Sequence, residues 1–288
     1  EYDTPGFIII NRLDRENSSF QRSLAAIQER FGREAVALHI PIGTEHDFGG
    51  VVDLVEMKAF TYKQDGDGKA TEADIPDDLQ ANAQSQREAL VEMVAEGDEE
   101  LMEIFFEEGD LTAEQLNQGI REAVRQRLLF PVLCTAALHG IGTDRVLHTI
   151  AHYLPSPDER GTFSGKSPAD DSEMSCNVDA TEPFAALVFK TVADPYAGRI
   201  SLMKVFSGSG KVDAPMLNPT TGATEKLANL SLVLGKHYEH TDAVVAGQLC
   251  AVAKLKDIHT GNTLCDKSRP VIIDPVVFPK AAISFAVE

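Results

Sequence analysis

A short apolar run near the start of the chain, Phe7 to Ile10, ends abruptly in the polar segment NRLD, Asn11 to Asp14. A buried strand of an open α/β sheet often ends in this way, and such folds place ligands in the loops at the carboxyl ends of their strands. A second buried run, FPVLCTA (Phe130 to Ala136), leads into the small-residue segment AALHG (136–140). These two runs predict an α/β sheet that gathers polar and small residues at one edge.

The charge and the cysteine pattern disfavour a DNA-binding protein and a protein with a cysteine-ligated metal site. The net charge of −19 disfavours bulk electrostatic binding of nucleic acid, so we expect no DNA partner. Between Glu72 and Arg127 the chain has sixteen acidic residues against four arginines, whereas from Glu182 onward eleven basic residues face ten acidic ones. The four cysteines form no CxxC pair, which indicates free thiols in a reducing cytoplasm rather than metal ligands. The near-neutral last third of the chain could still bind the phosphate backbone of a nucleic acid.

Neither end of the sequence has the features of a membrane or secreted protein. The polar start EYDTPG is no signal peptide, and no apolar run approaches the length of a membrane span. The chain begins with Glu1 rather than Met and stops in the strand-like run AISFAVE. We therefore expect a cytoplasmic, monomeric piece of a longer protein.

Periodicity divides the first part of the chain into elements. Ser18 can cap a helix that ends at Gly32, and AVALHIPI predicts the next strand. GGVVDLVEMKAFTY alternates like a strand before the hairpin-turn signal QDGDGK. A helical stretch follows from about Asp78 to Arg127, with breaks near Gly97 and Gly109 and the capping box Thr112-x-x-Gln115. GTDRVLHTIAHYLPSP predicts a helix with these residues inward: Val146, Leu147, Ile150 and Leu154.

The second part of the chain is predicted to be all-β. Residues 158–181 are rich in Ser, Asp and Gly, which indicates a linker. Short β runs separated by SGSG and NPTTG follow, and they predict a small antiparallel barrel. The expected layout is an α/β part over 1–45, an acidic α+β insert over 46–129, the end of the α/β part over 130–157, the linker, a β-barrel over 182–275, and the start of a further domain over 276–288.

The polar segment after the first strand suits recognition of a purine base. A carboxylate such as that of Asp14 accepts two parallel hydrogen bonds, and guanine presents such a donor pair at N1 and its 2-amino group. Asn11 can bridge loops or reach the other base edge, and Arg12 can lay its planar guanidinium over a base. Because N-x-x-D is a weak motif, the alternative is that Asn11 and Asp14 only cap the helix near Ser19. The small residues in the loop after the second strand have two possible roles. They could let the backbone approach a ligand closely, or they could simply allow tight packing at the strand end.

In combination, these segments make the chain resemble the bacterial elongation factor G family of translational GTPases. NRLD resembles the family's guanine-specificity motif, and TAAL resembles its later loop, whose backbone contacts the guanine oxygen. PIGTEHDFGGVVDLVEMKA resembles the start of the family's insert, and HYLPSP resembles the end of its G domain. FKTVADPYAGRISLMKVFSGSG and KDIHTGNTLCD resemble its second domain, and PVVFPKAAISFAVE resembles the junction into the third.

The resemblance implies a partial P-loop-type G domain with an α+β insert, followed by a β-barrel second domain. It implies that GTP or GDP is bound through Asn11, Arg12, Asp14, Ala136, Ala137 and Leu138, with Mg²⁺ only in the intact protein. It also implies ribosomal translocation with GTP hydrolysis, contacts of the barrel with ribosomal RNA, and contacts of the acidic insert with the large-subunit stalk protein. Arg12 replaces the family's usual Lys and Ala136 its common Ser, and DRENSSF and LSLVLGKHYEHTDAVVAG diverge, which leans toward a paralogue.

The sequence contains no phosphate loop of the form GxxxxGK[ST], so no catalytic residue is expected within it and the fragment alone is predicted to be inactive. The DFGG segment (47–50) is interpreted as a turn. His148 and His152 are four residues apart, a spacing that could bind zinc, but surface or core histidines are the favoured interpretation, for His139 as well. Two alternatives remain: a ribosome- or RNA-binding module, and another translational GTPase of the ribosomal protection or release factor type.

Overall fold

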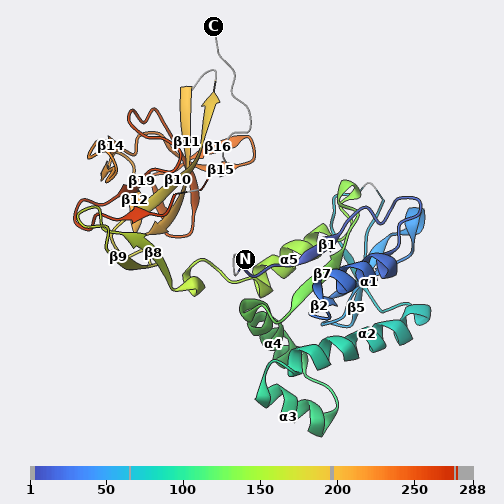
Figure 1. Cartoon of the computed structure of the whole chain (residues 1–288). Coiled ribbons are helices and arrows are strands. Elements are labelled where there is room, and N and C mark those ends of the chain that lie inside the picture. Colours follow the sequence, from blue (N-terminus) through green and yellow to red (C-terminus); the bar gives the residue numbers. More distant parts are fainter. Residues whose placement is uncertain (1–3, 65, 195–197, 276, 278–288) are drawn as a thin grey trace. The chain divides into compact units, whose positions relative to one another are not determined.

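The computed structural model describes residues 4–64, 66–194, 198–275 and 277 (Figure 1). The chain divides into two units, Glu1–Pro155 (unit 1) and Ser156–Glu288 (unit 2). Within the described residues, no helix is long and apolar enough to cross a lipid bilayer. The predicted start of a further domain over 276–288 lies outside the described residues except for position 277.

Unit 1 is built on a three-stranded parallel sheet in the order β1-β7-β2 (Figure 1). Its strands are β1 (Ile8–Ile10), β7 (Phe130–Cys134) and β2 (Ala35–Ala37). Ile10 pairs with Cys134, so β1 and β7 end side by side. The predicted meeting of the two strand ends at one edge is therefore confirmed.

The AVALHIPI segment forms two strands rather than one. After β2 the chain enters β3 (His39–Ile42), which belongs to the sheet of the insert. Leu38 joins the two sheets, because its N–H donates to the Val132 carbonyl at 3.0 Å and its carbonyl accepts from the Leu54 N–H at 3.0 Å. The prediction of a single strand is wrong because both halves are equally apolar, and only long-range pairing separates them.

The insert contains a four-stranded antiparallel sheet in the order β3-β4-β5-β6. Its further strands are β4 (Gly50–Asp53), β5 (Lys58–Thr61) and β6 (Thr71–Ala73), and the short 3-10 helix η1 (Glu45–Asp47) precedes β4. GGVVDLVEMKAFTY is thus two paired strands with a turn between them. The predicted hairpin across QDGDGK is confirmed by the pairing of β5 with β6.

Three helices complete the insert: α2 (Asp77–Ala95), α3 (Glu99–Glu108) and α4 (Ala113–Gln126). The predicted breaks near Gly97 and Gly109 are confirmed, and so is the capping box between Thr112 and Gln115. The buried Arg87 of α2 ties the helices to the sheet. Its guanidinium donates to the carbonyls of Leu54, Val55 and Leu111 at 2.9 to 3.0 Å.

Two further helices flank the parallel sheet. α1 (Phe20–Phe31) is capped by Ser19, whose hydroxyl accepts from the Arg22 N–H, whereas Ser18 donates its hydroxyl to the Leu13 carbonyl. The cap is therefore one residue later than predicted. Gly32 ends the helix with a φ of 97°, as expected.

The second of these helices, α5 (Thr143–Tyr153), has a different buried face from the predicted one. Leu147 is 66% exposed and Ile150 is 40% exposed, whereas Thr149 and Tyr153 are buried. Val146 and Leu154 do pack against the core, as predicted. The prediction is wrong for Leu147 and Ile150 because the spacing of apolar residues indicates an apolar face but not which part of that face a neighbouring element covers.

Unit 2 consists of antiparallel sheets. The largest has the order β14-β13-β19-β10-β11-β18-β15-β16, and unit 2 contains a buried cluster that includes Met203, Leu230 and Ile258. The strands of unit 2 are β8 (Thr162–Lys166), β9 (Glu173–Asn177), β10 (Ala185–Asp194), β11 (Gly198–Ser207), β12 (Ser209–Lys211), β13 (Pro215–Leu217), β14 (Thr224–Lys226), β15 (Leu230–Leu234), β16 (His237–His240), β17 (Ala243–Val245), β18 (Leu249–Ala253), β19 (Thr263–Cys265) and β20 (Ile272–Ile273). The predicted antiparallel β-domain is confirmed, while its closure into a barrel stays a prediction.

The segment 158–181 is not a structureless linker. After the 3-10 helix η3 (Asp158–Arg160), β8 and β9 pair with each other, and β8 also pairs with β20. Phe163 and Cys176 pack in a core cluster with Ala185 and Leu187 of β10. The composition wrongly predicted a linker because the β8–β9 hairpin buries only alternate residues. The residues that cover them belong to other strands of unit 2.

Candidate functional site

The carboxyl ends of β1 and β7 are joined by one side chain. Asn11 Oδ1 accepts hydrogen bonds from the Ala137 N–H at 3.1 Å and from the Thr135 hydroxyl at 3.0 Å. The same oxygen accepts from the Arg12 N–H at 2.8 Å. Asn11 therefore bridges the two loops, as one of its expected roles required. Because Ser19 caps α1, the alternative that Asn11 caps this helix is wrong.

Asp14 lies at the same edge and is held by its neighbours. Its carboxylate is only 14% exposed, and Oδ2 lies 3.2 Å from Arg15 Nε and 3.6 Å from His139 Nε2. The preceding residue, Leu13, is buried, and its N–H donates to the Thr135 carbonyl at 3.3 Å. The helix-capping alternative fails for Asp14 as well, since the cap is Ser19.

The loop after β7 is a tightly closed turn, which we call the 135–142 loop. Ala136 and Ile141 form an antiparallel bridge across it, and the 3-10 helix η2 (Ala137–His139) lies between them. Gly142 has a φ of 75°, and a Cβ there would lie 2.7 Å from the Cys134 carbonyl oxygen. Only glycine fits this close return of the chain toward α5.

The backbone amides of the 135–142 loop are used unequally. The Ala136 N–H donates to the Ile141 carbonyl at 3.1 Å, and the Ala137 N–H donates to Asn11. Among the residues that the structure describes, the Leu138 N–H has no hydrogen-bond partner, and its side chain is 78% exposed. Of the three predicted backbone contacts, only this N–H remains available to a ligand.

A cavity of about 280 Å³ opens beside Asp14. One wall is formed by the edge of the parallel sheet, including Asp14, Arg15 and His139, and the other by the insert and its approach. The residues of the second wall are His46, Asp47, Phe48, Gly49, Tyr62 and Gln64. The sequence patterns predict a site role for none of the residues of the second wall, and for His139 they favour a surface or core histidine. His139 lies three residues after Ala136, but no spacing rule connects it with Asp14.

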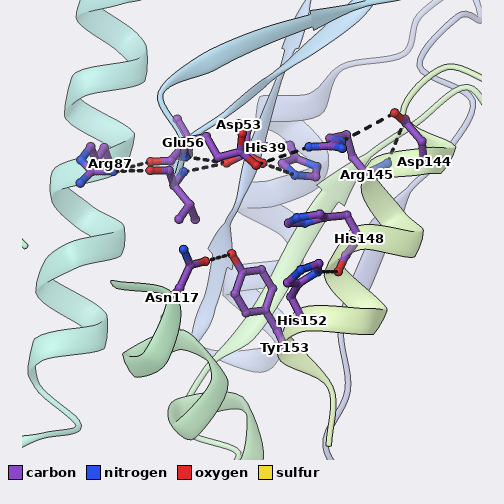
Figure 2. A network of polar contacts seen from close by, with 12 residues as sticks. His39, Asp53, Glu56, Arg87, Asn117, Asp144, Arg145, His148, His152 and Tyr153 are labelled. Carbon is purple, nitrogen blue, oxygen red and sulfur yellow. Dashed lines mark hydrogen bonds and ion pairs between the residues drawn. The ribbon is translucent and has the colours of Figure 1, made fainter. Parts of the chain in front are cut away.

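A polar network joins the insert to α5, where Arg145 Nη1 lies 3.5 Å from Glu56 Oε1 (Figure 2). His39 Nε2 lies 3.5 Å from Asp53 Oδ2, and both side chains are buried. Burial alone would raise the pKa of Asp53, but the bonds from His39 and from the amides of Glu56 and Val55 outweigh it, so this pKa lies below its usual range. The pair is therefore a structural part of the insert.

The two histidines of α5 stack on each other, with their ring centroids 3.9 Å apart (Figure 2). Burial lowers the pKa of His148, and the neighbouring His152 and Arg145 lower it further. His152 Nδ1 contacts the His148 carbonyl at 2.9 Å. In the described ranges, no group of three His, Cys, Asp or Glu side chains is placed to hold a metal ion.

Comparisons with known proteins relate the chain to one domain family and to solved structures. Residues 183–267 match the family model of elongation factor G domain 2. The fold resembles a crystal structure from Thermus thermophilus with a TM-score of 0.79 and 24% sequence identity, over 97% of this chain and 39% of that one. The chain thus spans about two fifths of the length of that protein. The first match supports a relationship with the translational GTPases. Residues 183–267 are therefore similar to the second domain of elongation factor G, in a chain that shares its fold with a longer Thermus thermophilus protein.

Proposed function

We propose that this chain is part of a translational GTPase of the elongation factor G type, and that the edge formed by β1 and β7 reads the guanine base of GTP or GDP. The observation that carries the proposal is the bridge from Asn11 to the Ala137 N–H and the Thr135 hydroxyl. This bridge holds the two strand-end loops together, and Asp14 faces a cavity beside it.

The hydrogen-bonding groups at this edge match guanine better than adenine. The Asp14 carboxylate can accept from N1–H and from the 2-amino group of guanine. The Leu138 N–H, which has no partner within the described residues, can donate to the guanine oxygen at position 6. Adenine carries an amino group at position 6 and an acceptor at N1, so it would place two donors together at Leu138 and two acceptors together at Asp14.

The faces of the base would be covered by Arg12 and Leu138. Both side chains are exposed, and Arg12 has a φ of 65° that turns the chain sharply after β1. A planar guanidinium on one face and an apolar side chain on the other suit a flat, polarisable ring. Replacement of the family's usual Lys by Arg12 preserves the positive charge that this role needs.

The chemistry of GTP hydrolysis is assigned to residues outside this 288-residue sequence. Phosphoryl transfer depends on amides and a lysine that cradle the phosphates and on a bound Mg²⁺, and the sequence contains no GxxxxGK[ST] to supply them. The residues of the β1–β7 edge would contribute the selection and orientation of the base. We expect the 288-residue chain to release no phosphate from GTP above background, as measured by a phosphate-release assay, and Mg²⁺-dependent turnover by the purified chain would contradict this.

The partners follow from the same proposal. The intact protein would act in the cytoplasm as a monomer and promote translocation on the ribosome. Unit 2 would contact ribosomal RNA through its part from Glu182 onward, where eleven basic residues face ten acidic ones. The insert would contact the stalk protein of the large subunit through its acidic surface. The match over residues 183–267 supports this ribosomal setting.

Substitution of Asp14 tests the reading of the base. In the full-length protein, Asp14→Asn should weaken GDP and relatively favour XDP, because the new amide donates where xanthine carries an oxygen. Loss of a charged pair of hydrogen bonds should cost roughly 2–4 kcal/mol, or about 30- to 1000-fold in affinity. Nucleotide competition measures the ratio.

The matched control is Glu45→Gln, which changes a nearby carboxylate that accepts from the Asn17 N–H at 2.8 Å. This variant should keep the GDP to XDP ratio of the unaltered protein. If Asp14→Asn also keeps that ratio, Asp14 does not read the base.

A further inference from the structure

The 135–142 loop is held at its second end by the insert. The Tyr62 hydroxyl, just after β5, donates to Asp144 Oδ1 at 2.5 Å, and Asp144 lies two residues beyond Gly142 (Figure 2 shows Asp144 and Arg145). Burial raises the pKa of Tyr62 far above its usual range, and the bond to Asp144 raises it further. The phenol thus stays protonated and able to donate at any physiological pH.

A second residue of α5 strengthens the same junction. The Arg145 guanidinium lies over the ring of Phe60 of β5, 4.2 Å from its centroid. Its Nη1 also lies 3.5 Å from Glu56 Oε1 in the turn before β5. Of these consecutive residues at the start of α5, Arg145 therefore contacts the β4–β5 hairpin, and Asp144 contacts Tyr62, which follows the hairpin.

The backbone of the insert also approaches the loop closely. A Cβ added at Gly140 would lie 3.0 Å from the Gly68 Cα, so no larger residue at 140 fits without a shift of the insert. Gly140 has a φ of 72°, and its carbonyl accepts from the Thr143 hydroxyl at 2.8 Å. The loop is thus confined between Asn11 on one side and the insert on the other.

We infer that Tyr62 is a positioning residue for the 135–142 loop, through which the insert sets the place of the Leu138 N–H. This inference rests on the proposed function for its meaning in nucleotide binding. Asn11 fixes the start of the loop, and Tyr62 fixes the exit of the loop into α5. Because coupling between two sites is reciprocal, a partner that displaces the β4–β5 hairpin would also change base affinity.

The test compares two tyrosines that attach opposite ends of α5. Tyr62→Phe removes the bond to Asp144, and the control Tyr153→Phe removes an equivalent bond, from Tyr153 to Asn117 Oδ1 at 2.5 Å. Amide hydrogen exchange of the chain should be roughly tenfold faster over residues 137–141 in Tyr62→Phe and unchanged there in Tyr153→Phe. Asp144→Ala, which removes the acceptor instead of the donor, should reproduce the effect of Tyr62→Phe.

Affinity of the full-length protein for GDP provides the second arm. Tyr62→Phe should weaken GDP about five- to tenfold, and Tyr153→Phe should not. Unchanged loop exchange in Tyr62→Phe, or equal acceleration in both variants, would overturn the inference. Faster loop exchange with unaltered GDP affinity would also overturn it, because the loop would then not serve the base. If even the unaltered protein binds no GDP, the proposed function fails, while the exchange data still decide whether Tyr62 positions the loop.

Discussion

Two polar regions of unit 1 differ in how completely their groups are used. Arg87 is buried in the insert, and its guanidinium donates to three backbone carbonyls and contacts Asp110. At the β1–β7 edge, by contrast, Asp14 faces a cavity, and the Leu138 N–H has no partner among the described residues. A saturated buried network stabilises a fold, whereas a carboxylate that lines a cavity and a backbone N–H without a partner can still bind a ligand. The first region therefore stabilises unit 1, and the second region has the groups that the proposed base recognition needs.

The largest expected effect is a loss of stability when the hydrogen bonds of Arg87 are removed. Arg87→Met should lower the free energy of unfolding of unit 1 by about 3 kcal/mol, because three buried carbonyls lose their donor at roughly 1 kcal/mol each. Urea unfolding followed by circular dichroism at 222 nm reports on this unit, since all of the α-helices in the described residues lie there.

The same variant separates the two regions. Arg87→Met should leave the ratio of GDP to XDP affinity in the full-length protein unaltered at urea-free conditions. A changed ratio would show that the insert network and the base edge are one functional region, contrary to the comparison.

The next effect concerns the Asn11 bridge, which holds together the two loops at the β1–β7 edge. Asn11→Ala removes the acceptor that holds the Ala137 N–H and the Thr135 hydroxyl, so unit 1 should lose about 1–2 kcal/mol of stability. Unlike Arg87→Met, this variant should also weaken GDP at least tenfold, because the two loops are no longer held together. Competition assays with GDP check this, and Ser23→Ala, in which a hydroxyl bond to the Ser19 carbonyl is lost, serves as a control outside the edge. Retention of full affinity by Asn11→Ala would contradict the bridging role.

The smallest effect is a dependence on pH. The pKa of Asp53 is lower in the folded protein than its ordinary value of 3.8, so its ionised form stabilises unit 1 above that value. This stabilisation is lost as the pH falls below about 4 toward the folded pKa. Asp53→Asn should therefore show a shallower loss of unfolding free energy between pH 5 and about 3, measured by urea titrations at each pH. An equal slope in both proteins would mean that other carboxylates dominate acid unfolding.

Local signals predicted those features that depend on neighbouring residues. The end of β1, the glycine breaks around α3 and the capping box at Thr112 are set by short stretches of sequence, and each is confirmed. β7 ends at Cys134, two residues before the predicted Ala136. Asn11 and Asp14 could be singled out because polar groups directly follow a buried strand. The meeting of those strand ends followed from the geometry of parallel sheets.

Features that depend on distant residues were beyond the reach of pattern reasoning. The β8–β9 hairpin is covered by β10 and β20, and the division of AVALHIPI at Leu38 depends on Val132 and Leu54. Tyr62 reaches Asp144 across 82 positions of sequence, and neither residue carries a motif. His139 lies beside Asp14 only because the 135–142 loop folds back over the edge of the sheet.

Whether the β1–β7 edge reads guanine is measured most directly by comparing GDP, IDP and ADP for binding to the full-length protein. Inosine keeps the oxygen at position 6 and N1–H but lacks the 2-amino group, so it retains the contact to the Leu138 N–H and loses one of the two contacts to Asp14. GDP should therefore bind about tenfold or more tightly than IDP, and IDP much more tightly than ADP. Equal affinities for GDP and ADP would contradict the claim that the β1–β7 edge reads guanine.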